Sequence, residues 1–269
     1  MAIEIIDKLQ PKSGCEFVGE FAGVMPVSAF LSMLQLPPED GPMLRGYSEL
    51  SIQRKPEGWT LMTEYIKKVI DQRRNHPGDD IVSRVTQGQL NGRPITDHDV
   101  LSICQVLIGG GLDTVVTMTS FIAWYLADHP EDRKTLRENP DLIPGAVEEF
   151  ARRFGTTNIG REVNKDLVYR GVEMRKGDMV CVCTPLYGLD DSLYPDSLAV
   201  NIRRQPPARH MAFGSGVHNC AGAGLARREM AIFIDEWLKR IPDFRIKVGT
   251  TPVVSTGLVN LMSEMWLEW

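Results

Sequence analysis

Apolar residues recur along much of the chain at the three- to four-residue spacing of an amphipathic helix. The clearest such segment is 57–75, where the pattern stops before Pro77. Two prolines followed by two acidic residues at 37–40 favour the first turn of another short helix. The same apolar spacing predicts helices at four further places, namely residues 16–36, 131–138, 141–153 and 221–240.

One apolar segment is much longer than the others. Over residues 100–127 the only charged side chain is Asp113. A helix capped by Thr96 and continuing to about Asp128 would be roughly 45–50 Å long at 1.5 Å per residue. That length would also span a bilayer. However, the charge and the three glycines at 109–111 in its centre favour the buried central helix of a soluble protein.

The pattern changes to short strands after residue 160. Leu167–Tyr169 and Val180–Cys183 have the composition of strands, and 243–269 indicates further short strands. Residues 185–219 show almost no periodicity. Earlier in the chain, Leu90-Asn91-Gly92-Arg93 predicts a tight hairpin turn. Helices therefore come first, followed by a small β region with one more helix, an order typical of an α+β fold that is mainly α.

Composition narrows the class of protein. The 269 residues are 43% hydrophobic, which is enough for a buried core, and no linker divides them, so one domain over 1–269 is expected. A net charge of -5 gives no global basic field for nucleic acid or anionic lipid. Five scattered cysteines do not resemble a secreted disulfide framework, and no signal-peptide pattern is visible. A reducing cytoplasm is therefore expected.

The strongest chemical signal is a glycine-rich stretch ending in a cysteine, Phe213–Gly222. Cys220 directly precedes a predicted helix, whose dipole and free N–H groups favour a thiolate. Glycines let the backbone approach something flat and bulky without a clash. A structural cysteine is one alternative interpretation. A zinc site that combines Cys220 with His218, or with Cys181 and Cys183, is another, although spacings of two residues are unusual for zinc.

Three motifs in this order resemble the cytochrome P450 family. Phe213, Gly216, His218, Cys220 and Gly222 form the pattern Phe-x-x-Gly-x-His-x-Cys-x-Gly, which is similar to the family's haem-ligand loop. Glu149-Phe150-Ala151-Arg152 resembles its Glu-x-x-Arg helix, and Gly110-Gly111-Leu112-Asp113-Thr114 resembles its oxygen-binding helix. Segments similar to the soluble bacterial branch that hydroxylates camphor and related terpenoids are 91–96, 111–116, 225–229 and 240–244.

The resemblance implies a role for each motif. Cys220 would be the axial ligand of haem b, Thr114 would line an oxygen pocket, and Asp113 would relay protons from solvent. Independently of the resemblance, the Thr114 hydroxyl can bond the carbonyl of Gly110 four residues earlier and open a bulge. A helix kink with one satisfied acid is the structural alternative.

Other family positions carry further expectations. Glu149 and Arg152 would form a buried pair that orders the segment before the cysteine loop, whereas an ordinary surface helix would give only a minor salt bridge. Arg161 and His218 would contact the haem propionates, and Phe213, Gly216 and Gly222 would shape the cofactor loop. Positions that would line the substrate pocket, with core packing as the alternative, are Val106, Gly109, Thr157, Ile159, Leu258 and Val259.

The resemblance also implies partners. These are O2, a small hydrophobic substrate of terpenoid type, and a ferredoxin that delivers electrons; no nucleic acid and no membrane partner is expected. Arg227 and Arg228 would form a cationic patch for an acidic ferredoxin, and a solvated helix face is the alternative.

The chain departs from the family in one respect. Residue 1 aligns within the family's fourth helix, so the earlier helices, the first strands and the loop over the substrate are expected to be lacking. This loss would expose apolar surface, leave a sheet edge unpaired and let water reach the iron, which favours uncoupled oxygen reduction. Two hypotheses follow: a monooxygenase, and a truncated haem-binding fragment or remnant without turnover.

Overall fold

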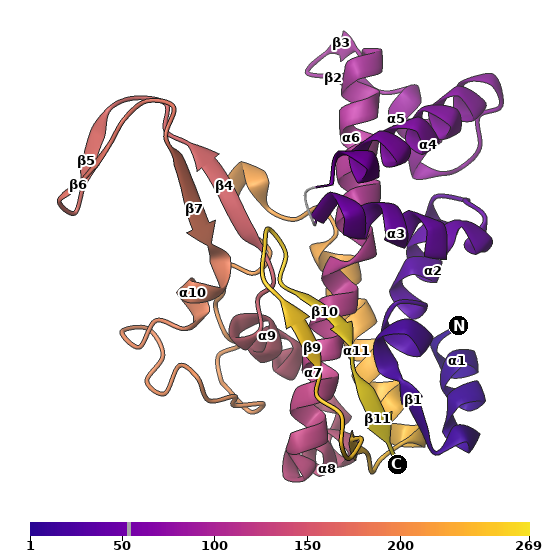
Figure 1. The fold of residues 1–269 in the computed structure, drawn as a ribbon, viewed down its shortest axis with the longest axis vertical. Coiled ribbons are helices and arrows are strands. Elements are labelled where there is room, and N and C mark those ends of the chain that lie inside the picture. Colours follow the sequence, from indigo (N-terminus) through magenta and orange to yellow (C-terminus); the bar gives the residue numbers. More distant parts are fainter. Residues whose placement is uncertain (53–54) are drawn as a thin grey trace.

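Two consecutive helices form the axis of the molecule (Figure 1). The computed structural model describes residues 1–52 and 55–269. In it α6 (Asp97–Leu112) is followed by α7 (Thr114–Asp128). The Thr96 hydroxyl accepts a hydrogen bond from the Asp99 N–H at 3.2 Å, and the Asp99 carboxylate accepts one from the Thr96 N–H at 2.9 Å. The predicted long helix is thus confirmed at both ends, with one break at Asp113.

Helices surround this axis in two groups. At one end α6 packs against α3 (Gly41–Ile52), α4 (Pro56–Asn75) and α5 (Ile81–Thr86). At the other end α7 packs against α8 (Pro130–Glu138) and α11 (Ala223–Arg240), and α11 also packs on α9 (Ile143–Arg153). The helices predicted from 57–75, 131–138, 141–153 and 221–240 are confirmed. Helix α5 was not predicted; the side chain of Asp80 caps it by accepting from two backbone N–H groups.

The shorter helical elements lie between these. They are α1 (Ala2–Leu9), α2 (Met25–Met33), α10 (Thr184–Gly188), η1 (Gln10–Lys12), η3 (Pro38–Asp40), η4 (Pro140–Leu142) and η5 (Gly216–His218). The turn at η3 leads directly into α3, as the sequence predicts.

By length and apolar composition the span Asp97–Asp128 would be able to cross a membrane. In the fold it packs against α2, α3, α4, α5, α11 and a C-terminal strand.

The helical prediction over residues 16–36 is confirmed for most of the segment, although the helix is not continuous. This segment begins in strand β1 (Gly14–Glu16), continues as the π-helical turn η2 (Val18–Ala22) and then forms α2. The Gly23 N–H donates to the Val18 carbonyl at 2.7 Å, five residues back. A Cβ on Gly23 would lie 2.0 Å from Nη1 of Arg45 and 2.8 Å from the Val18 carbonyl oxygen, so a larger residue would force one of these groups to move. The helical path is thus interrupted next to Arg45 of α3.

The strands form small antiparallel units. A three-stranded sheet has the order β1-β11-β8 and joins the N-terminal region to the end of the chain, and the other pairs are β9 with β10, β2 with β3, β4 with β7, and β5 with β6. Their bounds are β2 (Gln89–Leu90), β3 (Arg93–Pro94), β4 (Asn158–Glu162), β5 (Leu167–Tyr169), β6 (Val172–Met174), β7 (Met179–Cys183), β8 (Arg245–Ile246), β9 (Val253–Ser255), β10 (Leu261–Glu264) and β11 (Trp266–Glu268). The strands predicted at 167–169, 180–183 and within 243–269 are confirmed.

The predicted hairpin turn is confirmed between β2 and β3. Asn91 and Gly92 have φ values of +52° and +77°, as a two-residue turn between twisted strands requires. Between residues 185 and 219 only the end of α10 and η5 are regular, as the lack of periodicity predicts. The architecture is α+β and mainly α.

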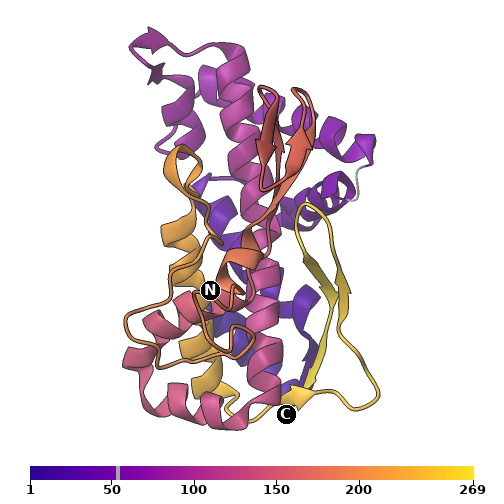
Figure 2. The ribbon, with the colours of Figure 1, turned by 90° about the vertical axis from the view of Figure 1, so that its left-hand side faces the viewer.

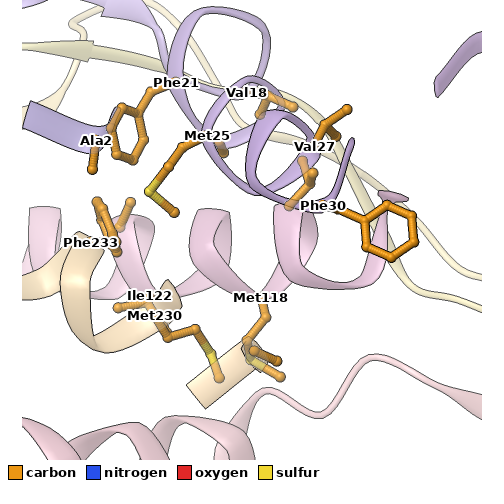
Figure 3. Packing of buried hydrophobic residues seen from close by; sticks show 14 of the residues in the cluster. Ala2, Val18, Phe21, Met25, Val27, Phe30, Met118, Ile122, Met230 and Phe233 are labelled. Atoms are coloured by element: carbon orange, nitrogen blue, oxygen red, sulfur yellow. The ribbon is translucent and has the colours of Figure 1, made fainter. Parts of the chain in front are cut away.

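The core lies where the N-terminal elements, α7 and α11 meet (Figure 3). The N-terminal side contributes Phe21 and Met25, α7 contributes Ile122, and α11 contributes Met230 and Phe233. These side chains are buried and belong to one continuous apolar cluster. The cluster fixes the start of α11 relative to the α6–α7 axis, and this positions the cysteine loop.

Candidate functional site

The cysteine loop leads directly into α11. Cys220 lies two residues before Gly222, the N-cap of the helix, and its N–H donates to the Phe213 carbonyl at 2.8 Å. The Cys220 side chain is exposed, as is the whole stretch 215–222. The thiol therefore lies on an open surface near the positive end of a helix dipole.

Two glycines give the loop its shape. Gly214 and Gly216 have φ values of +68° and +61°, a left-handed conformation that strains other residues. A Cβ on Gly214 would also lie 2.9 Å from the His218 carbonyl oxygen. At Gly222 a Cβ would lie 3.9 Å from Sγ of Cys220. The thiol is thus presented beside bare backbone.

One side of α6 is open in the middle of the axis. Val106 is 74% exposed although α6 packs against α2, α3, α4 and α5. A Cβ on Gly109 or Gly110 would meet nothing within 4 Å. The Thr114 hydroxyl donates to the Gly110 carbonyl at 2.9 Å, as predicted from the sequence, and the helix is interrupted between them at Asp113. The open side therefore combines an apolar side chain, bare backbone and one hydroxyl.

Asp113, at the interruption itself, is buried and only 6% exposed. Its Oδ1 lies 3.7 Å from Nε of Arg45, and its Oδ2 is buried without a hydrogen-bond partner among the described residues. Burial raises the pKa of Asp113 above its usual value, although Ser48 and Arg45 act in the opposite direction. A carboxyl group with a raised pKa and one free oxygen is suited to hold and pass on a proton.

Strand β4 and the C-terminal turn bring four predicted pocket residues together. Thr157 forms an isolated antiparallel bridge with Val259. The Leu258 carbonyl accepts a hydrogen bond of 2.8 Å from the first N–H of β4. Ile159 and Arg161 share one face of β4 because alternate residues of a strand point the same way. Arg161 is exposed on that face.

The three surfaces occupy the same side of the molecule. In Figure 1 the loop before α11, the β4–β7 pair and the tip of β9–β10 all lie to the left of α6. Figure 2 views that side and shows the start of α11 and the β9–β10 pair on opposite sides of α6. Val106, Val217 and Leu258 are 74%, 97% and 50% exposed. An accessible thiol, bare helix backbone and apolar surface fit a flat, apolar metal macrocycle.

The pair predicted at Glu149 and Arg152 is fully buried and belongs to a larger network. Arg152 donates to both carboxylate oxygens of Glu149 at 3.0 and 2.8 Å, and Arg204 does so at 2.7 and 3.2 Å. Arg152 also donates to three backbone carbonyls at 2.6 Å each, those of Gly188, Ser197 and Ala199. The first of these carbonyls is at the end of α10 and the other two lie in the irregular segment before the cysteine loop, so the pair holds both on α9.

Arg227 is engaged within the protein. It donates to both carboxylate oxygens of Glu148 at 2.6 and 3.1 Å, and its guanidinium lies 4.4 Å from the centroid of the Phe213 ring. Nε2 of His210 lies 3.0 Å from the same carboxylate. Burial opposes ionisation of Glu148, but the hydrogen bonds from His210 and Arg227 outweigh it and lower the pKa of Glu148 to about 2. Arg228, by contrast, is exposed.

Sequence reasoning missed Arg45, Arg204, Glu148 and His210. Arg45, Arg204 and Glu148 each contact a predicted residue from a distant part of the chain, and His210 contacts Glu148 across 62 residues, so no local spacing indicates these contacts. The zinc alternative gains no support, because within residues 1–52 and 55–269 no three His, Cys, Asp or Glu side chains gather as a metal would need. The other predicted contacts remain predictions.

Comparisons with known proteins agree with this geometry. A family model described as Cytochrome P450 matches residues 39–253. The chain is 35% identical over 262 residues to a protein of Sinorhizobium fredii (strain NBRC 101917 / NGR234) described as "Probable cytochrome P450 127A1", covering 96% of this chain and 63% of the relative. The crystal structure of CYP101J2 matches with a TM-score of 0.90 at 38% sequence identity, and the match covers all of this chain and 68% of that protein. The crystal structure of CYP101C1 matches with a TM-score of 0.88 at 36% identity, and the match covers all of this chain and 69% of that protein. The chain thus spans just under two thirds of that relative's length.

Proposed function

Because the chain belongs to the cytochrome P450 family, we propose that it forms the haem-binding, oxygen-activating part of a monooxygenase that hydroxylates a small hydrophobic substrate of terpenoid type. The family implies haem b as the cofactor. The observation that carries the proposal is the exposed Cys220 thiol at the start of α11. Bound haem supplies an iron that, with a thiolate ligand, activates molecular oxygen.

The residues of the cysteine loop would hold the cofactor. Cys220 would supply the thiolate, and Phe213, Gly216 and Gly222 would keep the loop in the shape that leaves Sγ accessible. The propionate groups would be bound by His218 of the cysteine loop and Arg161 of β4, and both side chains are exposed. The left-handed φ of Gly216 supports this role, because a side chain there would force the loop to change.

The substrate would bind among the predicted pocket residues. Apolar exposure supports this proposal: Val106 is 74% and Leu258 50% exposed, and Gly109 leaves the α6 backbone bare. The bridge between Thr157 and Val259 fixes the C-terminal turn beside β4, and Ile159 follows on the same strand face as Thr157. Thr114 would orient oxygen through its hydroxyl, and Asp113 would deliver protons.

Replacing Asp113 by asparagine is expected to lower turnover by roughly 100-fold, the size of a typical general acid contribution. The amide keeps the shape of the carboxyl group but cannot release a proton. Product formation from a terpenoid, with a ferredoxin as electron donor, measures the loss. Asp128→Asn, at the exposed end of the same axis, should leave turnover unchanged. Equal rates for Asp113→Asn and the parent chain would exclude the proton-delivery role.

Electrons would come from an acidic ferredoxin that docks near the start of α11, in the cytoplasm. Arg228 is the better candidate for this contact because it is exposed. Arg227 would contribute less than the sequence predicts, because Glu148 already neutralises its charge.

The proposed haem ligation is tested by the reduced, carbon-monoxide difference spectrum of the chain expressed with haem supply. We expect the band of a thiolate-ligated haem, and its complete loss in Cys220→Ala. Cys183→Ala is the matched control, since it removes another thiol outside the loop and should keep the band. Haem uptake without this band, or a band that survives Cys220→Ala, would contradict the proposal.

The alternative function is haem binding without turnover. The chain spans 63% of the length of the relative from Sinorhizobium fredii, and residues 215–222 around the thiol are exposed. A correct spectrum combined with no product from any terpenoid, despite reduction by a ferredoxin, would favour this alternative.

A further inference from the structure

One face of the β4–β7 pair carries three sulfur atoms. Met179, Cys181 and Cys183 alternate along β7, so they share a face of the strand. Their partners on β4 are Glu162, Gly160 and Asn158. Ile159 and Arg161 of the proposed haem and substrate site belong to the opposite face by the same alternation. The sulfur face is therefore separate from the site described above.

The two thiols are already spaced like ligands of one metal ion. Sγ of Cys181 lies 3.7 Å from Sγ of Cys183. Two sulfur atoms at about 2.3 Å from a common metal, with a tetrahedral angle between them, are about 3.8 Å apart. Cys181 is exposed and Cys183 is partly exposed, so an ion can reach both from solvent. Binding requires little movement of either side chain.

The third sulfur atom lies on the same face of β7. Met179 is 70% exposed, so its thioether is accessible from solvent. Its methyl carbon lies 3.2 Å from the position of a Cβ built on Gly160, the residue paired with Cys181. The Met179 side chain thus reaches across the strand pair into the space that Gly160 leaves empty, opposite Cys181.

We propose that Met179, Cys181 and Cys183 form a binding site for a soft monovalent cation, Cu(I). Thiolate and thioether sulfur are the ligands that such an ion prefers. Zinc prefers four ligands drawn from Cys, His, Asp and Glu, and in the described part of the chain no third side chain of these types joins the two cysteines. A set of two thiols and one thioether therefore favours Cu(I) over Zn²⁺.

Binding exchanges protons for the metal without any redox step. One Cu(I) ion displaces the two thiol protons, which go to solvent, and the thioether adds as a neutral ligand. The complex therefore carries one negative charge.

The test is an anaerobic titration of the full chain, expressed with haem supply and kept reduced by a phosphine, with Cu(I). Bathocuproine disulfonate serves as a competing chelator whose coloured complex reports the Cu(I) that the protein has not taken up. We expect each chain to take one Cu(I) ion from the chelator. The double variant Cys181→Ser, Cys183→Ser should take none. Met179→Leu should weaken binding at least roughly tenfold, since even indirect partners of metal ligands contribute about that much.

Two controls separate this site from others. Met33→Leu removes another exposed methionine, and Cys220→Ser removes the thiol of the cysteine loop. Both variants should still take one Cu(I) ion per chain from the chelator, as the parent chain does. Cu(I) uptake that disappears with Cys220, or that survives the double cysteine variant, would overturn the proposal. So would an unchanged affinity in Met179→Leu, or a Zn²⁺ ion bound more tightly than Cu(I) by the same two cysteines.

Discussion

Replacing Arg152 by methionine is expected to lower the free energy of unfolding by about 3–5 kcal/mol, the cost of breaking a buried ion pair. Arg152 and Glu149 both have no exposed side-chain surface. Methionine fills similar volume but leaves the Glu149 carboxylate with one arginine instead of two. It also leaves the three backbone carbonyls that Arg152 now contacts without their donor. Urea-induced unfolding measures the change.

Arg153 provides the matched control for this substitution. It is the next residue on α9, is more exposed, and donates to only one backbone carbonyl, that of Leu198 at 2.7 Å. Arg153→Met should cost under about 1 kcal/mol, a usual value for a partly exposed arginine. If Arg152→Met and Arg153→Met had equal cost, the Glu149 network would not contribute in the way the geometry indicates.

The same substitution should loosen the chain before the cysteine loop. Hydrogen exchange is expected to accelerate over residues 188–204, because Arg152 and Arg204 tie both ends of this segment to Glu149. Burial opposes ionisation of Glu149, but the two arginines outweigh it and lower its pKa. The Glu149 network therefore contributes fully to stability at pH values above the pKa that Glu149 has in the unfolded chain. The contribution is lost as the pH falls through the lower pKa that Glu149 has in the folded chain.

Local contacts were the part of the site that the sequence predicted well. The hydrogen bond from Thr114 to the Gly110 carbonyl joins residues four apart, and helical geometry alone brings them together. The capping of α6 by Thr96 and the turn at Asn91–Gly92 follow from equally local rules.

Contacts between distant segments account for what the sequence did not predict. At the break within residues 16–36, Gly23 meets Arg45 of α3, and just before it β1 pairs with β11 at the end of the chain. The partner of Asp113 is that same Arg45. Neither pairing leaves a periodic signal in the sequence, because each depends on how separate helices pack.

The burial of Glu229 is another feature that the sequence does not reveal, and it has a large effect on stability. Within the pattern of α11 it is one more acidic residue, yet in the fold it is only 6% exposed. Its Oε1 is buried without a hydrogen-bond partner among the described residues, and the side chain lines a hollow with Met25, Ala29 and Ile232. Burial raises the pKa of Glu229 to about 7. A carboxyl group here is therefore half-protonated near neutral pH.

Replacing Glu229 by glutamine is therefore expected to stabilise the chain at pH 8.5 by about 3 kcal/mol, and to change it little at pH 4. In the unfolded chain a glutamate loses its proton near pH 4.3. Between that pH and about 7 the folded state holds more protons than the unfolded state, so its stability falls as the pH rises. Above pH 7 the full cost of a buried charge is present, and glutamine removes it while keeping the shape of the side chain.

Urea unfolding of the parent chain and the variant at both pH values isolates this effect. At each pH the other titratable groups contribute equally to the stability of the two proteins, so the difference between them reports Glu229 alone. Glu236→Gln is the matched control on the same helix. Glu236 is paired with Arg240 and lies near Lys239, so losing its charge should not stabilise the chain at either pH. A gain for Glu229→Gln of equal size at pH 4 and pH 8.5 would show that packing causes it, and the raised pKa would then not account for the stability of this core.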